Sequence, residues 1–304
     1  MSDGASAGGK SSGVVPIALL LFGIGMVGAL LLVQRQTTEE FGAQTRKRAV
    51  ELEVIRRAAS PKGEARRRSL LEKLAKTGES LARVELTDAS LAGIDLSGAV
   101  LNFAVLAGAD LTKAKLANAR LVGAKAAKAD FSGADFSGAD LTGADLQDAI
   151  LRGATFNGAD LTSARLRGAD LRRAQLARAR LVKAQLVSAD LRAASLEAVE
   201  LVEGDLFEAD LRGSTLRAAQ LQGARLAFAN LAGLDLREIE RGALPVAELR
   251  RSCLHTGTTQ LPVWVAFDLD RYRLPKRCCR LWSDDFVEGA DGVCLPADVG
   301  AQGG

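Results

Sequence analysis

A strict five-residue period runs through the middle of this chain. From Leu81 to Leu236 every fifth residue, 32 positions in all, is Leu or Phe, with the single exception of Ala126. A helix of 3.6 residues per turn would spread these residues around its whole circumference. A continuous strand would place successive members on opposite faces. The period therefore predicts a chain that turns every five residues and points one apolar side chain inward each time.

The repeating unit is clearest in residues 134–143, which read Ala-Asp-Phe-Ser-Gly and Ala-Asp-Leu-Thr-Gly. A small residue is followed by Asp, by the apolar centre, by a polar residue and often by Gly. Ala occupies the first position of most units, and we expect it to point inward beside the Leu, where a larger side chain would not fit. Gly, Ser and Asp at the other positions suit tight turns.

This pattern resembles the pentapeptide-repeat family, whose consensus is A(D/N)LXX, over about half of the chain. The resemblance implies an all-β solenoid, a right-handed quadrilateral β-helix with four pentapeptides in each coil. Thirty-two repeats would then make about eight coils, about 38 Å long at a strand spacing of about 4.8 Å. Stability would be a sum over neighbouring coils.

The segments outside the repeat divide the chain into five parts. We expect a disordered N-terminal tail (1–13), a transmembrane helix (14–33), a charged helical connector and N-terminal cap (34–78), the β-helix (79–238) and a Cys-containing C-terminal cap and tail (239–304). Residues 14–33 carry no charge and are long enough to span a bilayer. A cleaved signal peptide would have a shorter apolar region.

The connector holds 12 Lys and Arg residues against 6 Glu. One amphipathic helix is expected to end at Ser60-Pro61, and Leu70, Leu71 and Leu74 indicate a second. The positive charge could attract anionic lipid head groups. Alternatively, the connector is a solvated stalk whose last helix covers the open first coil, and this reading is favoured.

The C-terminal part departs from the repeat. Pro245 is expected to open a helix from Val246 to Ser252, and alternating apolar residues from Val263 to Leu269 predict a strand. The simplest role is a cap, because the end of a β-helix is an open sheet edge.

Two features disagree about the side of the membrane. The basic residues that follow the predicted span are Arg35, Arg46, Lys47 and Arg48. The positive-inside rule therefore places the rod in the cytoplasm, and this is the side we expect. The four cysteines suggest disulfides and a periplasmic or extracellular rod instead. Possible disulfides lie among Cys253, Cys278, Cys279 and Cys294.

No catalytic, cofactor or metal site is predicted. His255 is the only histidine, and the cysteines form no Cys-x-x-Cys pair. A run of four carboxylates would point outward from four different sides of a coil, so it could not converge on a metal. These residues are Asp130, Asp135, Asp140 and Asp145.

Residues twenty apart share one side of a four-sided coil, and one side should carry a column of Asp beside a column of Arg. This double column is either a solvated lattice of ion pairs or a regular polar docking surface. Its residues are Asp110, Asp130, Asp170, Asp190, Asp210, Arg152, Arg172, Arg192 and Arg212.

The sequence thus favours a non-enzymatic, membrane-anchored scaffold that presents a rigid β-helix to a protein partner. The resemblance raises an alternative, because some family members regulate a nucleic-acid enzyme, gyrase, by mimicking DNA. The repeat contains 19 basic and 21 acidic residues. This near-neutral balance disfavours mimicry, which needs a strongly acidic surface, and equally disfavours nucleic-acid binding.

Overall fold

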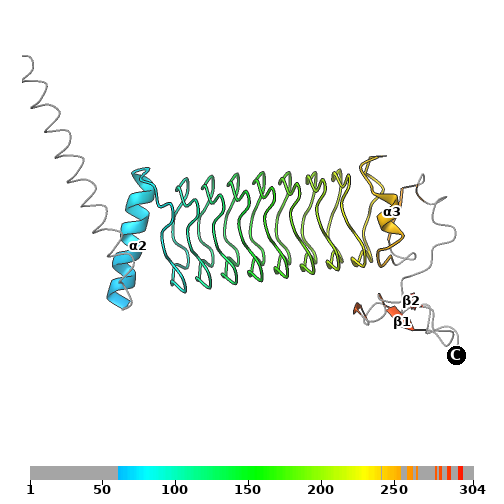
Figure 1. Cartoon of the computed structure of the whole chain (residues 1–304), viewed down its shortest axis with the longest axis horizontal. Helices are drawn as coiled ribbons and strands as arrows, with labels where there is room; N and C mark the ends of the chain where they lie inside the picture. Colours follow the sequence, from blue (N-terminus) through cyan, green and yellow to red (C-terminus); the bar gives the residue numbers. More distant parts are fainter. Residues whose placement is uncertain are drawn as a thin grey trace, which may run out of the picture. The chain divides into compact units, whose positions relative to one another are not determined.

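The computed structural model describes residues 61–240, 242–254, 259–262, 265, 278, 281–282, 286–288 and 294–296. All belong to one compact unit, residues 55–304. The named elements are α2 (Pro61–Lys76), α3 (Val246–Leu249) and the strands β1 (Phe286–Glu288) and β2 (Cys294–Pro296), with the repeat between α2 and α3 (Figure 1). The predicted tail, transmembrane helix and first connector helix lie outside the described residues. Within them, no helix combines the length and apolar character needed to cross a membrane.

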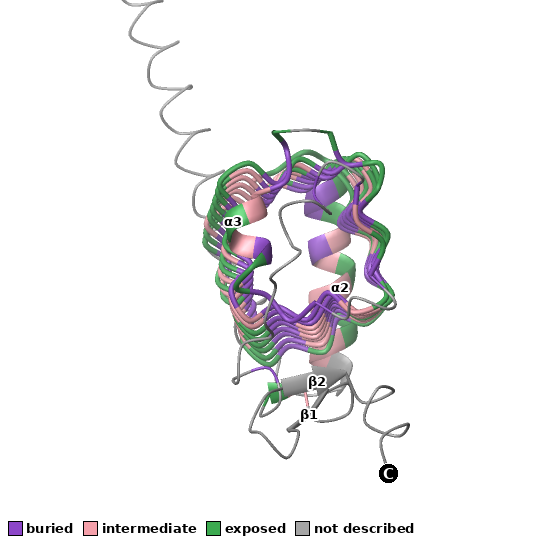
Figure 2. Ribbon diagram, turned by 90° about the vertical axis from the view of Figure 1, so that its right-hand side faces the viewer, coloured by how far each residue is buried: buried purple, intermediate pink, exposed green. Residues whose placement is uncertain are grey.

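The repeat winds into coils of twenty residues. Each residue directly before an inward Leu or Phe, from Glu85 to Asp210, forms a parallel β-bridge with the residue twenty positions later. Only one or two residues are extended between turns, so these are isolated bridges rather than longer strands. Four five-residue sides make each coil, as the four-sided outline in Figure 2 shows. The predicted β-solenoid is therefore confirmed, with its sides built in the expected register.

The core consists of stacked apolar side chains. All 32 period positions are buried, and so are the residues two places earlier from Val84 onward, including the departures Val84, Ile94, Val199 and Leu234. Figure 2 shows the buried residues lining the inside of the coils. Each buried Leu contributes about 2 kcal/mol of apolar transfer free energy.

The coil that contains Ala126 fills its core with aromatic rings instead of a Leu at this position. Ala126 is buried, and the same coil supplies Phe131 and Phe136, whose ring centroids lie 5.1 Å apart. Phe136 also stacks on Phe156 of the next coil at 4.8 Å, with the rings nearly parallel. The two rings occupy the space that a Leu at position 126 would otherwise fill.

Each side ends in a turn whose geometry the sequence only partly reveals. The second residue after every inward centre, from Arg83 to Gly233, has a positive φ, and 18 of these residues are not glycine. The N–H of the next residue donates to the carbonyl of the centre, as from Val84 to Leu81 at 3.2 Å. This is a type II turn, in which a left-handed non-glycine residue costs about 1 kcal/mol or more. Stacking of the coils must outweigh that cost.

The Asp of the consensus has a local structural role. Its carboxylate accepts a hydrogen bond from the backbone N–H two residues later, as Asp130 does from Ser132 at 2.9 Å and Asp160 from Thr162 at 2.9 Å. Such side-chain bonds stabilise turns. The recurring Asp therefore holds the corner that follows each inward Leu.

Helix α2 covers the first coil. Leu71 and Leu74 are buried, Arg68 donates to the carbonyl of Ala92 at 2.5 Å, and Glu72 accepts from the N–H of Asp95 at 3.4 Å. The helix begins at Pro61 and contains the predicted second helix of the connector. This arrangement agrees with the reading in which the last connector helix closes the N-terminal sheet edge.

The last coil is covered by a chain that returns to it twice. Cys253 and Gln260 form parallel bridges with Asn230 and Asp235, and α3 buries Leu249. The helix predicted to reach Ser252 ends earlier, at Leu249, because the N–H of Cys253 pairs with the carbonyl of Ala229 at 2.8 Å. The chain has to leave the helix to rejoin the sheet.

The strand predicted from Val263 to Leu269 is wrong at its one described residue, since Val265 is helical and buried. The strands that do form, β1 and β2, pair in antiparallel fashion further along, with Val287 opposite Leu295.

Replacing Ala126 with Leu should destabilise the protein although it restores the period. Adding bulk to a filled core costs about 1–3 kcal/mol, and Phe131 and Phe136 already fill this coil. Chemical denaturation of the Ala126→Leu variant should therefore show a lower midpoint. Ala126→Leu combined with Phe136→Leu should recover part of the loss. A higher midpoint for the single variant would mean that the coil has unfilled space.

Candidate interaction surface

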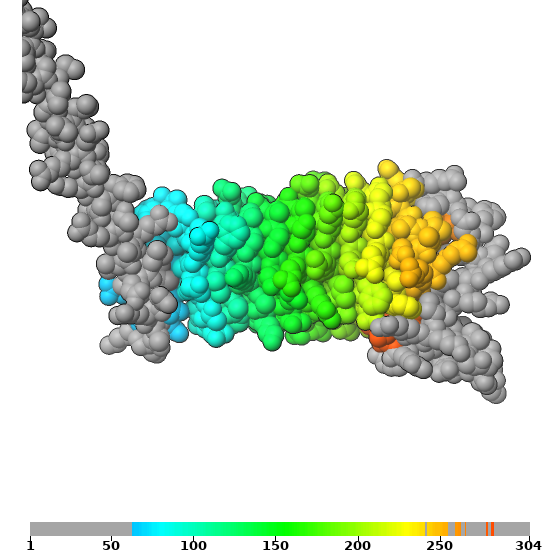
Figure 3. Space-filling model, viewed as in Figure 1, coloured from blue at the N-terminus to red at the C-terminus, as the bar shows by residue number. Residues whose placement is uncertain are grey.

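The structure places all nine predicted surface residues on one side of the solenoid. Successive β-bridges join Asp110, Asp130, Ile150, Asp170, Asp190 and Asp210 in one column, and each predicted Arg lies two residues after a member of that column. We call this the ladder side. Figure 3 shows how successive coils form parallel ridges across one face of the molecule.

Carboxylates and guanidinium groups alternate along the second half of the ladder side. Arg172 binds Asp170 through two bonds of 2.8 Å, and its Nε also lies 3.4 Å from Asp190. Arg192 repeats this with Asp190, at 2.9 and 2.6 Å. Arg152, one coil earlier, donates to Asp170 at 2.5 Å. The predicted lattice of ion pairs is therefore present in this half, where Arg172 and Arg192 each link carboxylates of adjacent coils.

The first half of the same side has no such lattice. Asp110 and Asp130 are followed by Thr112 and Ser132, whose N–H groups donate to the Asp carboxylates at 3.0 and 2.9 Å. These two aspartates therefore stabilise their turns, and they are not part of the lattice of ion pairs.

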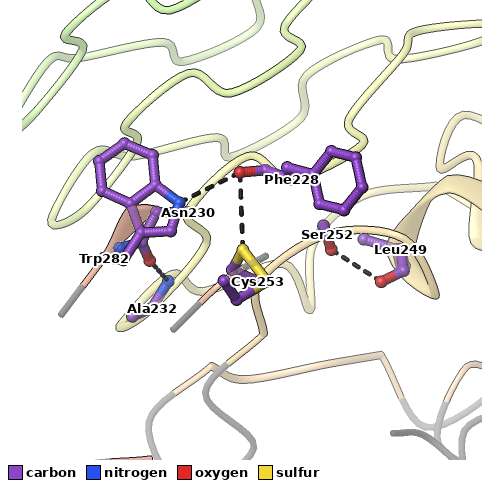
Figure 4. Close-up of a disulfide and its surroundings, with 8 residues drawn as sticks. Phe228, Asn230, Ala232, Leu249, Ser252, Cys253 and Trp282 are labelled. Atoms are coloured by element: carbon purple, nitrogen blue, oxygen red, sulfur yellow. Dashed lines mark hydrogen bonds between the residues drawn. A yellow bond between two sulfur atoms is a disulfide. The ribbon is translucent and has the colours of Figure 1, made fainter. Parts of the chain in front are cut away.

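The ladder ends against the C-terminal cap. Asp210 is buried, and Arg212 binds it through bonds of 3.0 and 2.7 Å. The guanidinium of Arg212 lies 5.8 Å from the centroid of the Trp282 ring, a cation–π contact. The indole N–H of Trp282 donates to the carbonyl of Phe228 at 3.1 Å (Figure 4). Trp282 comes from a distant part of the sequence, and the repeat pattern carries no signal for it.

A disulfide fastens this cap to the last coil. Cys253 and Cys278 are bonded at 2.08 Å, and the sulfur of Cys253 lies 3.5 Å from the carbonyl of Phe228, the same carbonyl that Trp282 binds (Figure 4). This pair is one of the possible disulfides predicted from the sequence. The pairing of Cys279 and Cys294, and the surroundings of His255, lie outside what the structure describes.

The ladder holds the carboxylate of Asp170 ionised. Burial of Asp170 opposes ionisation, but hydrogen bonds from Arg172 and Arg152 outweigh it and lower the pKa of Asp170 to about 2. Hydrogen bonding to Asp190 likewise raises the pKa of Arg192 above its ordinary value. Asp170 and Arg192 therefore both stay charged across the physiological pH range.

Two open hollows lie along the ladder side. The first, which we call the arginine groove, has a volume of about 620 Å³ and is lined by Arg152, Gly153, Arg172, Arg173, Arg192 and Ala193. The second, the tryptophan hollow, has a volume of about 310 Å³, shares Arg192 with the first and ends at Leu281 and Trp282. The five-residue period alone does not predict such a hollow. The arginine groove forms where the small residues Gly153 and Ala193 lie one coil before and one coil after Arg173.

Two of the other sides carry a different charge pattern, which the sequence analysis did not predict. Opposite charges alternate within a single column, as in Arg165 with Asp145 at 3.3 Å and Arg225 with Asp205 at 2.7 Å. A column that alternates in sign neutralises itself. The like-charged Asp column of the ladder side needs its separate Arg column for the same purpose.

The four carboxylates from Asp130 to Asp145 do not converge, since each pairs with the N–H two residues later. In the part of the chain that the structure describes, no group of three or more His, Cys, Asp or Glu side chains is placed to hold a metal ion.

Comparisons with known proteins agree with this architecture. The family model described as pentapeptide repeats (8 copies) matches residues 80–118, 114–153, 154–192 and 205–239. HetL, a pentapeptide-repeat protein involved in heterocyst differentiation regulation in the cyanobacterium Nostoc sp. strain PCC 7120, is 33% identical over 57% of this chain and 88% of its own, with a TM-score of 0.28. No curated protein matches the chain.

Two further solved structures are similar. A pentapeptide-repeat protein of the Arabidopsis thaliana thylakoid lumen is 34% identical over 36% of this chain and 69% of its own, with a TM-score of 0.19. Full-length QnrB1, a plasmid-mediated fluoroquinolone resistance protein, is 18% identical over 63% of this chain and 88% of its own, with a TM-score of 0.34.

The bridges between residues twenty apart define the class of protein, a tandem-repeat β-solenoid with four sides per coil. With the repeat model and the identity to HetL, the chain belongs to the pentapeptide-repeat family, and its solenoid is the right-handed β-helix of that family.

Stability should depend on the ionisation of Asp170. Because its pKa is about 2 in the folded state and about 3.9 when unfolded, its contribution is present above about pH 4 and is lost as the pH falls through 2. Asp170→Asn should lower the free energy of unfolding at pH 7 by about 1–2 kcal/mol, and the difference from wild type should shrink toward pH 2. A difference that stays constant between pH 7 and pH 2 would contradict this account.

Proposed function

We propose that this chain is a non-enzymatic interaction module, anchored in a membrane by residues 14–33, that presents its β-helix to a protein partner. The observation that carries the proposal is the ladder side, where charged groups are held in a fixed order along several coils. A rigid surface of this kind loses little conformational entropy on binding. Proteins of this family are typically structural or interaction proteins without enzymatic activity.

The membrane anchor is supported by the sequence. Residues 14–33 contain no Asp, Glu, Lys or Arg, and a stretch of about 20 apolar residues matches the thickness of a bilayer core. The positively charged connector that follows would lie near the lipid head groups. We expect neither a cofactor nor a nucleic-acid partner.

For the side of the membrane, the Cys253–Cys278 bond favours the periplasmic or extracellular alternative, because disulfides persist in oxidising compartments. The positive-inside rule favours the cytoplasm. We propose the periplasmic or extracellular side, because the disulfide needs an oxidising compartment to persist. The positive-inside rule describes a statistical tendency in the distribution of Lys and Arg.

Regulation of a nucleic-acid enzyme by DNA mimicry is the competing function. The carboxylates of the ladder, at Asp170, Asp190 and Asp210, are each bound by arginines. Paired carboxylates cannot stand in for the unpaired phosphates that a basic protein recognises. The ladder side therefore argues against mimicry.

Fractionation of cells that express the full chain tests the anchor. The protein should sediment with membranes and resist extraction by alkaline carbonate, because a spanning helix is held by its apolar length. Free thiols should be blocked in denaturant immediately after acid quenching of the cells, because Cys253 and Cys278 are buried in the folded protein. Both should then resist labelling until a reductant is added. Recovery of the chain in the carbonate-soluble fraction would refute the anchor. Labelling of both thiols without reductant would place the rod in a reducing compartment.

A further inference from the structure

We infer that the arginine groove and the tryptophan hollow together bind an extended acidic segment of a protein partner. The segment would present two carboxylates on one face and, two residues beyond the second, an apolar side chain. This inference rests on the proposed function only in taking the ligand to be a protein.

Charge on the ladder side favours an acidic ligand. Among the described residues of this side from Arg152 onward, four arginines accompany two aspartates before the cap is reached, which leaves two positive charges in excess; they are Arg152, Arg172, Arg173 and Arg192, with Asp170 and Asp190. Each guanidinium has five N–H donors. Arg172 and Arg192 each direct Nε and Nη2 at an aspartate, and among the described residues nothing accepts a hydrogen bond from their Nη1 groups. Those donors remain for a bound carboxylate, and bidentate Arg–carboxylate bonds are strong.

The groove has room for a bound chain. Gly153 and Ala193 lie one coil before and one coil after Arg173, so small residues flank this arginine along the axis. A Cβ added to Gly153 would meet no atom within 4 Å, so the space above it is open. The side chain of Arg152 is 56% exposed and that of Arg192 is 41% exposed. A ligand can therefore reach both.

The tryptophan hollow offers an apolar contact at the end of this groove. Leu281 is one of two large apolar side chains that are exposed among the described residues. Trp282 beside it is held in place by its bond to the carbonyl of Phe228 and by Arg212 against its ring. An apolar side chain inserted here would cover Leu281 and lie against a ring that is already ordered.

The spacing selects an extended segment. Arg152 and Arg212 are three coils apart, which is about 14 Å at about 4.8 Å per coil. Four residues of an extended chain cover about 13 Å, and alternate side chains point to the same face. A segment of the form Asp-x-Asp-x-Phe therefore places two carboxylates over the arginine groove and the aromatic ring over the tryptophan hollow. The reversed order, Phe-x-Asp-x-Asp, fits a chain that runs the other way.

Other polyanions fit less well. A nucleic-acid strand or an anionic lipid surface would bring phosphates past Asp170, Asp190 and Asp210 as well as past the arginines. Neither supplies an apolar side chain for Leu281 and Trp282.

Fluorescence anisotropy on the full chain in detergent micelles, at about 0.1 M salt, where the Debye length is about 10 Å, tests the inference. The labelled probes are Ser-Gly-Asp-Ser-Asp-Ser-Phe-Ser-Gly and its reverse, with control peptides in which both Asp are Asn or Phe is Ser. At least one probe should bind, and both of its control substitutions should weaken binding. The variant Arg172→Gln with Arg192→Gln should weaken it by about tenfold or more, since two charge-assisted contacts are lost.

A matched variant separates a site from general charge. Arg165→Gln with Arg225→Gln removes the same charge and also breaks ion pairs between coils, but on another side; it should change binding less than about twofold, as expected for screened charges beyond a Debye length. Leu281→Ser should weaken the Phe probe and leave the Phe-to-Ser control peptide unchanged. Far-UV circular dichroism confirms that each variant is folded.

Three results would overturn the inference. They are equal losses from the two arginine pairs, no binding of either probe, and tighter binding of single-stranded DNA or phosphatidylserine vesicles that is lost in the Arg172→Gln, Arg192→Gln variant. If the probes fail while the chain still resists carbonate extraction and cross-links to a membrane protein, the proposed function stands and only this inference falls. If the chain is not membrane-bound but the probes bind, the reverse holds.

Discussion

Stacking of one apolar side chain on another twenty residues away is the interaction on which this structure depends. It repeats through all 32 buried period positions, and it is strong enough to hold 18 non-glycine residues in left-handed turns. Because the stack fixes each turn, it also fixes every outward-facing residue. Columns of charge on the surface are thus a consequence of order in the core.

The ladder side shows how that order becomes a surface property. In its second half, the like-charged Asp column is balanced by Arg172, Arg192 and Arg212, which lie beside it at the spacing of the coils. The same geometry aligns the arginine donors and leaves a groove where Gly153 and Ala193 replace longer side chains. The cap contributes Trp282 to the end of this groove. The indole N–H of Trp282 donates to the carbonyl of Phe228, close to the Cys253–Cys278 disulfide.

The period predicted the solenoid because burial at every fifth residue has few structural solutions, and the twenty-residue register then put the nine predicted surface residues on one side. Pairing of Arg with Asp followed from the same register. The cap was harder, because Pro245 signals where α3 begins while its end depends on the sheet partner of Cys253. The contact of Arg212 with Trp282 joins residues 70 positions apart, and Trp282 lies outside the repeat, so no local pattern predicts it.

Deletion of one coil tests the twenty-residue register most directly. Removing residues 134–153 joins Gly133 to Ala154 and puts Phe156 where Phe136 was, so every column continues. Removing residues 134–152 deletes one residue fewer but leaves one extra residue that has to bulge out of its side. The account predicts that thermal unfolding of the 20-residue deletion stays cooperative and occurs at a higher temperature than that of the 19-residue deletion. An equal or higher melting temperature for the 19-residue deletion would contradict it.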